Sequence, residues 1–317
     1  MRLLLVELTR LRWRRAVLAL VALSILIPAF VAWGEIHNTR PYTQQEIDRA
    51  TSRVKAEVGQ DKFFERNVRQ CAKHPERFGI DVPEGSDPAA ACEPQMLRDY
   101  AGLYREDLSL QRVKEQSGVG VIVVLAGLAM LIGATFVGAD WASGSMSNQL
   151  LFEPRRLRVY AAKAAAVLLV GLVVSGVVLS VWWAVLGQVA AHRDLTTSAA
   201  TWADIRGSVV RGGLLAALAG VGGYAMTMLF RSTVATLGVL FGTVVATTLL
   251  IASLPLENAQ RWLPSNNIGA WVLDGIDYYT NNSQEHLSKW DGGLYLLVLL
   301  VGALVLSSWS FRRRDVP

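Results

Sequence analysis

The chain has 317 residues, of which 52% are hydrophobic, and it carries a formal net charge of +5 with a mean hydropathy of +0.32. The apolar residues are gathered in long uncharged runs, several of which reach the roughly 20 residues needed to cross a bilayer. The basic residues form no stripe interleaved with aromatics on a soluble module, so composition and charge indicate a membrane protein and exclude a nucleic-acid-binding one.

The first 15 residues are strongly basic, with five arginines against the single acid Glu7. Together with the apolar residues after them they have the outline of a signal peptide. The apolar run is long, however, and no small-x-small cleavage site precedes the charged segment that follows. We therefore expect residues 16–34 to be an uncleaved first span, with residues 1–15 inside the cell.

Residues 35–116 form a large polar insert with 13 basic and 15 acidic residues. An insert of this length lies outside the range over which loop charge sets orientation. Thr43 and Glu46 form a capping-box signature, which predicts the start of a helix. The segment is therefore expected to be a helical, extracellular insert.

The only two cysteines, Cys71 and Cys92, flank a Pro- and Gly-rich loop in this insert. If the insert lies outside the cell, a disulfide between them is favoured, and two free thiols are the alternative. Two cysteines and the nearby His74 fall short of a four-ligand set, so no metal site is expected.

Further apolar runs and polar connections follow in alternation. We expect spans at residues 117–139, 160–189, 208–230, 233–253 and 291–310, with connections at 140–159, 190–207 and 254–290 and a tail at 311–317. Six spans place both termini in the cytoplasm. The basic residues near both ends, at 155–163 and at Arg231 then lie on the cytoplasmic side, as the positive-inside rule requires. Within the outer connection, residues 267–279 have the pattern of an amphipathic helix.

The predicted membrane cores contain no Asp, Glu, Lys or His. Transporters coupled to ions or protons, and enzymes that act within the membrane, need such groups at depth, so both classes are disfavoured. The chain has no phosphate-binding loop, so energy from ATP would have to enter through another polypeptide. Arg211, near the outer start of the fourth span, either snorkels to the interface or contacts an anionic substrate headgroup.

Glycines are dense in the fourth and fifth spans. Gly238 and Gly242 have the spacing that lets two helices approach closely. Packing within the chain and an interface between two subunits are both compatible with this pattern.

A short polar stretch, residues 136–163, connects the second and third spans. Its residues at near-helical spacing are Trp141, Met146 (or Ser145), Gln149 and Phe152, and its basic residues are Arg155, Arg156, Arg158 and Lys163. One interpretation is a short amphipathic helix that docks to a soluble partner. The other is a surface helix whose basic group anchors to anionic lipid.

This stretch resembles the corresponding part of permease subunits in the ABC-2 (type V exporter) family of ABC transporters. Those permeases often show an acidic residue, three positions, Gly-Thr, a leucine pair, Pro-x-Arg and a lysine. The corresponding residues here are Asp140, Gly144-Ser145, Leu150-Leu151, Pro154-Arg155-Arg156 and Lys163. The resemblance extends to the whole membrane layout, although the insert is longer than in the simplest members.

The resemblance implies specific roles. Residues from Trp141 to Phe152 would be a coupling helix seated in a groove of a separate nucleotide-binding ATPase subunit. Trp141 and Phe152 would be its anchors, with Arg155 and Arg156 on the rim. The segment with Arg10, Trp13 and Arg14 would be an amphipathic interface helix along the membrane, and residues 254–290 would be re-entrant.

The resemblance also implies partners. ATP and Mg would be bound by the ATPase subunit, with no cofactor in this chain, and a second permease would complete a homodimer or a paralogous heterodimer.

The sequence thus predicts an all-α polytopic protein with six transmembrane helices in a bacterial plasma membrane, suggested by its arginine- and alanine-rich composition. Its expected function is that of an exporter permease for a hydrophobic or amphipathic drug, peptide or lipid, without enzymatic activity of its own. The alternative is a membrane sensor or envelope-assembly factor that acts through the insert. A membrane-embedded enzyme ranks third.

Overall fold

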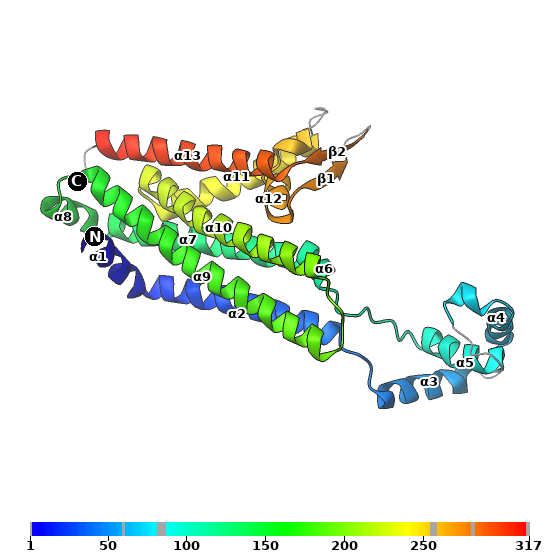
Figure 1. The fold of residues 1–317 in the computed structure, drawn as a ribbon. Coiled ribbons are helices and arrows are strands. Elements are labelled where there is room, and N and C mark those ends of the chain that lie inside the picture. The colour runs from blue at the N-terminus through cyan, green and yellow to red at the C-terminus, as the bar shows by residue number, and fades with distance from the viewer. Residues whose placement is uncertain (1, 59–60, 81–86, 254–258, 280–282, 315–317) are drawn as a thin grey trace. The chain divides into compact units, whose positions relative to one another are not determined.

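A computed structural model describes the chain except at residues 1, 59–60, 81–86, 254–258, 280–282 and 315–317. It contains two compact units. One unit combines Met1–Gly34 with Ser109–Pro317 and contains the long helices (Figure 1). The other, Glu35–Leu108, is the insert.

Five helices of the described chain are long and apolar enough to cross a membrane. They are α2 (Arg15–Asn38), the continuous helix Leu110–Ala142 that ends in α7 (Val119–Ala142), α9 (Arg156–His192), α10 (Ala199–Phe230) and α13 (Lys289–Arg313). The sixth expected span corresponds to α11 (Thr233–Ser253), which is also apolar. Its fully described part, Thr233–Thr247, is too short to be counted with the other five.

Several helices begin earlier than the sequence predicted. The second begins at Leu110 with α6 (Leu110–Val113), and it passes through η2 (Lys114–Gly118) into α7. Lys114, whose charge placed it in the insert, is buried and pairs with Asp204 at 3.7 Å. The polar connection expected at 190–207 is also shorter, because α10 begins at Ala199, where the Ser198 side chain accepts a hydrogen bond from the Thr201 amide at 3.0 Å.

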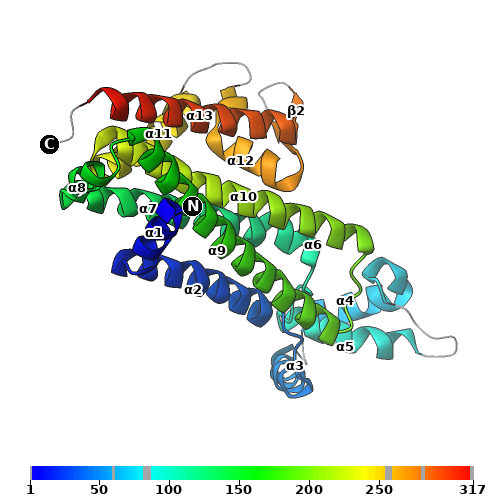
Figure 2. The same ribbon diagram turned by 60° about the vertical axis from the view of Figure 1, so that its left-hand side comes forward.

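Helix α10 lies at the centre of this unit and packs against α7, α9 and α13, as Figure 2 shows. Glycines allow the close approach: a Cβ at Gly223 would collide with the carbonyl of Met130, and one at Gly133 with the carbonyl of Gly220. Gly238 of α11, in contrast, has no other described part of the chain within 4 Å of where its Cβ would be. The packing role therefore belongs to the glycines at the contact of α7 with α10.

A small α/β element follows α11. It consists of η3 (Ala259–Trp262), α12 (Pro264–Leu273) and an antiparallel pair of strands, β1 (Ile276–Tyr279) and β2 (Gln284–Leu287). The helix expected over residues 267–279 ends at Leu273, because Asp274 and Gly275 adopt positive φ angles of 73° and 115°. The described part of the fold is helical, as predicted, and the prediction missed only this short hairpin.

Arg211 holds this element to α10. Its Nη2 donates a hydrogen bond to the carbonyl of Val272 at 3.1 Å, near the end of α12, where a cation opposes the negative end of the helix dipole. Asp274 follows, and the hydrogen bond from Lys289 at 2.6 Å, together with the charge of Arg211, holds the pKa of that carboxyl below its usual range. In this chain Arg211 serves to cap a helix.

The insert unit consists of α3 (Gln44–Val58), α4 (Lys62–Lys73), η1 (Pro75–Phe78) and α5 (Pro88–Tyr100). The predicted capping box is confirmed: the Thr43 amide donates to Glu46 at 2.9 Å, and the Glu46 amide donates to the Thr43 hydroxyl at 3.3 Å. A disulfide joins Cys71 of α4 to Cys92 of α5, and both half-cystines are fully buried.

Candidate functional site

A short helix, α8 (Ser145–Phe152), connects α7 to α9 at one end of the helical unit (Figure 1). The turn into it depends on Gly144, which has a φ of +69°, a conformation that side-chain-bearing residues rarely adopt. Helix α8 ends at Phe152, and Pro154 disfavours a helical conformation at Glu153 before it. The connection is therefore a compact, defined hairpin of helices.

Helix α8 has two chemically different faces. Met146 is fully buried and Leu150 packs beside it on a cluster that includes Phe136, Tyr160 and Phe311. On the other side, Leu151 and Phe152 are 81% and 91% exposed. Because two large apolar side chains lie next to each other in the open at the tip of a polar connection, this face has the chemistry of a docking surface.

Beneath α8 lies a cluster of fully buried charges. The ammonium group of Lys163 on α9 lies 2.8 Å from Glu7 of α1 (Arg2–Arg12) and 2.5 Å from Asp140 near the end of α7. All three side chains have no exposed area. A single lysine therefore connects three helices.

Two arginines complete this cluster. Arg14, in the turn between α1 and α2, pairs with Asp140 and donates to the carbonyl of Phe136 at 2.9 Å. Arg10 lies 3.4 Å from both Glu7 and Asp140. Three cations thus surround two carboxylates, which compensates both buried negative charges.

Helix α8 is bonded directly to the same cluster. The Ser145 hydroxyl donates to Asp140 at 2.8 Å, and the Gln149 side chain donates to Glu7. Arg10 in turn donates to the side-chain Oε1 of Gln149 at 3.2 Å. We call the seven residues Glu7, Arg10, Arg14, Asp140, Ser145, Gln149 and Lys163 the charge cluster. The members of the cluster come from α1 and the turn after it, α7, α8 and α9. The cluster therefore links α8 to all of these helices through hydrogen bonds and ion pairs.

The remaining predicted residues lie apart from the exposed face of α8. Trp141 is half-buried and packs edge-on against Phe311 at 6.2 Å, with Arg231 over its ring at 4.8 Å. Arg156 donates to the carbonyls of Phe311 and Arg314, where α13 ends, at 3.0 and 2.7 Å. These contacts place both side chains in intramolecular packing.

Pro154 and Arg155 are exposed next to α8, and Trp13 is 73% exposed beyond the end of α1. The predicted interface residues Arg10 and Arg14 instead turn inward to the charge cluster. The segment 1–15 is thus amphipathic in an unexpected sense: one face carries buried charge, and the other exposes Leu5, Val6 and Trp13.

Glu7 is the member that sequence reasoning missed. It is the only acid among five arginines, and it falls four residues before the buried Leu11 on the same helical face. An isolated acid in a basic segment signals a specific partner. Lys163 was counted with a surface basic group, but α9 begins at Arg156, so Lys163 lies within the helix and is buried.

Neither the sequence nor the described side chains offer a cofactor site in this chain. The described residues contain no cluster of His, Cys, Asp or Glu suited to a metal ion. The charge cluster itself has no free ligand group, because both of its carboxylates are engaged by cations.

Comparison with known proteins agrees with this arrangement. A family model described as ABC-2 family transporter protein matches residues 1–316. The chain therefore belongs to the ABC-2 family, as the resemblance of residues 140–163 predicted, and it is a membrane permease of the kind that is typically non-catalytic and works with an ABC ATPase. No curated protein and no solved structure matches the chain.

Proposed function

We propose that this permease couples ATP hydrolysis by a separate nucleotide-binding subunit to export of a hydrophobic or amphipathic substrate, and that α8 is its coupling helix. The observation that carries the proposal is the pair of exposed apolar side chains, Leu151 and Phe152, on a helix anchored to buried charges. A few residues that become buried near the centre of an interface supply most of its binding energy. Arg155 would lie on the polar rim.

Transmission would pass through the charge cluster. Closure of two ATPase subunits around ATP and Mg would push α8, and Ser145 and Gln149 would pass the displacement to Asp140 and Glu7. Lys163 joins these carboxylates to α9. Rigid helices then carry small shifts at one end to the other, as in other switching transitions.

A second permease would pack against α11. The exposed side of this helix includes Gly238, Gly242, Val234 and Phe241. Among the described residues, no other part of the chain lies within 4 Å of where a Cβ of either glycine would be, so the close approach that they permit is open to a partner helix. Both chain termini and α8 would then face the cytoplasm of a bacterial cell, since the N-terminal helix and the end of α13 lie at the α8 end (Figure 1).

The test is co-purification of the ATPase subunit with Phe152→Asp and Leu151→Asp. Each change places a charge in the docking face, and we expect loss of the complex with normal membrane insertion. Phe152→Leu is the matched control, because it keeps an apolar side chain at the same site and should retain the complex. An unchanged yield of ATPase with both Asp variants would refute the role given to α8.

The insert supports a second function, that of a membrane sensor or envelope-assembly factor. It is a separate compact unit with its own core and disulfide. Deletion of residues 40–108 distinguishes the two: a sensor would lose its response while ATPase activity and transport persist. Loss of transport itself on this deletion would instead place the insert in the export path.

A further inference from the structure

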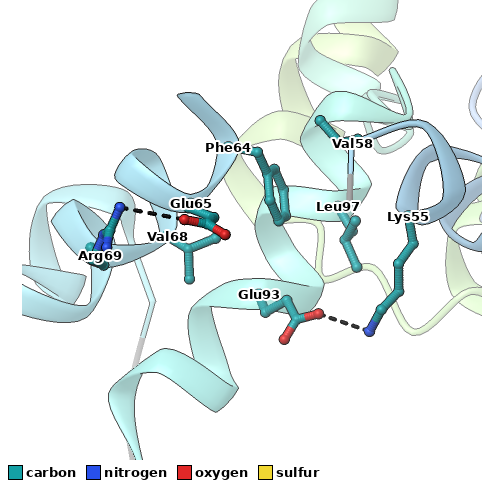
Figure 3. Close-up of a pocket in the computed structure, with 8 residues that line it drawn as sticks. All are labelled: Lys55, Val58, Phe64, Glu65, Val68, Arg69, Glu93 and Leu97. Atoms are coloured by element: carbon teal, nitrogen blue, oxygen red, sulfur yellow. Dashed lines mark hydrogen bonds and ion pairs between the residues drawn. The ribbon is translucent and has the colours of Figure 1, made fainter. Parts of the chain in front are cut away.

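The insert unit contains a cavity of about 380 Å³ that the coupling mechanism does not use (Figure 3). Its lining residues come from α3, α4 and α5 and are Lys55, Val58, Phe64, Glu65, Val68, Arg69, Glu93 and Leu97. Cavities that bind small ligands have volumes of roughly 300–1,000 Å³, so this one suits a single large side chain with its neighbouring backbone.

The floor of the cavity is apolar and fixed. Phe64 and Leu97 belong to the core of the unit, and Val58 and Val68 pack against that core. The disulfide between Cys71 and Cys92 joins α4 to α5, which carry six of the eight lining residues. An apolar group could therefore enter without a rearrangement of the walls, which lowers the entropic cost of binding.

The rim of the cavity carries two ion pairs. Lys55 of α3 lies 2.8 Å from Glu93 of α5, and Arg69 lies 3.5 Å from Glu65 within α4. Figure 3 shows one pair on each side of Phe64. Lys55, Glu65 and Arg69 are more than 60% exposed and Glu93 is 43% exposed, and the four charges sum to zero. The rim thus offers donors and acceptors on both sides of an apolar floor.

We propose that this cavity binds a peptide segment through one large apolar side chain. A peptide backbone presents both N–H donors and C=O acceptors beside each side chain, which matches a rim with both signs of charge. An acyl chain has no polar groups that could bond to this rim, and the rim, with no net charge, offers no net attraction to an anionic headgroup. This inference does not depend on ATPase docking at α8.

The test uses the full-length protein in detergent micelles and a fluorescein-labelled nonapeptide with one central Phe flanked by Lys and Glu. A matched peptide carries Ser in place of Phe. Burial of the aromatic ring predicts that the Phe peptide binds at least about tenfold more tightly, measured by fluorescence anisotropy. Equal affinity of the two peptides for the unmodified protein overturns the proposal.

Protein variants locate the site. Val68→Trp fills the cavity and should weaken the Phe peptide by about tenfold or more, whereas Ala56→Trp, at an exposed position of α3 outside the cavity, should not. Thiol labelling of Cys71 and Cys92 verifies that each variant retains its disulfide. Unchanged binding by a disulfide-intact Val68→Trp protein contradicts the assignment.

A second experiment distinguishes a peptide side chain from a lipid acyl chain as the apolar group that occupies the cavity. cis-Parinaric acid serves as a fluorescent acyl probe with the same protein variants. We expect that the Val68→Trp change does not alter the binding of cis-parinaric acid to the protein. We also expect that the acid does not displace the peptide. Displacement of the peptide, together with loss of the acyl probe in Val68→Trp, would assign the cavity to a lipid chain and overturn the peptide proposal.

Discussion

Replacing Lys163 by Met tests whether the charge cluster holds the membrane unit together. The change keeps the length and apolar part of the side chain but removes the ammonium that lies 2.8 Å from Glu7 and 2.5 Å from Asp140. Breaking a buried ion pair costs about 3–5 kcal/mol, because a charge is left buried without its partner. Arg10 and Arg14 still face the carboxylates, so we expect a loss of about 3 kcal/mol, at the lower end of this range.

Two further variants serve as comparisons for Lys163→Met. Lys114→Met removes another buried lysine, whose ion-pair partner Asp204 is 60% exposed and 3.7 Å away, so it should cost less than about 1 kcal/mol. Lys163→Met combined with Glu7→Gln removes a cation and an anion together, and it should cost less than the sum of the single changes. Reversible unfolding in mixed detergent micelles measures these variants and the Glu7→Gln single variant that the sum requires. A Lys163→Met protein as stable as Lys114→Met would refute the reasoning.

Three other predictions concern separate parts of the chain. Replacing Cys71 and Cys92 by Ser opens a loop of 21 residues and should cost about 3 kcal/mol in insert stability, seen as faster amide exchange in the insert alone; exchange unchanged there would contradict it. Gly223→Leu should prevent correct packing of α10, whereas Gly238→Leu should leave the monomer folded and weaken only association of two permeases, as judged by crosslinking; a well-folded Gly223→Leu protein would be inconsistent with the backbone contact. The Thr43 amide donates a hydrogen bond to the carboxylate of Glu46 and lowers its pKa. The stabilisation that this carboxylate gives to the start of α3 is therefore present above about pH 4.3 and is lost as the pH falls through the folded-state pKa. Glu46→Gln should abolish this pH dependence of amide exchange.

The long helices were accessible from sequence because their apolar runs are uninterrupted, and Thr43 with Glu46 marked the start of α3. The ends of the helices were harder to predict from the sequence, because a charged residue indicates the end of an apolar span unless its partner is known. Lys114 is such a case: its pairing with Asp204 depends on two helices that are distant in sequence. Pairing across the fold, rather than local pattern, decides where these helices begin.

The candidate site shows the same division. Gly144 and the apolar tip of α8 were predictable, because a turn and a helical spacing are local properties. The inward role of Trp141 was not, since its partner Phe311 lies 170 positions further along the chain. Glu7 and Lys163 are separated by a comparable distance, so only the folded chain shows that they meet.

The charge cluster has a consequence for how such a chain can diverge over generations. Two fully buried carboxylates, Glu7 and Asp140, share the ammonium group of Lys163, so loss of Lys163 takes from each of them the one cation of the cluster that is fully buried. Descendants that lose Lys163 should therefore also have lost Glu7 or Asp140, and single-step routes between such sequences should be rare. The membrane-facing positions around the cluster can change independently of one another. Among related sequences, substitutions within the cluster should therefore occur in pairs.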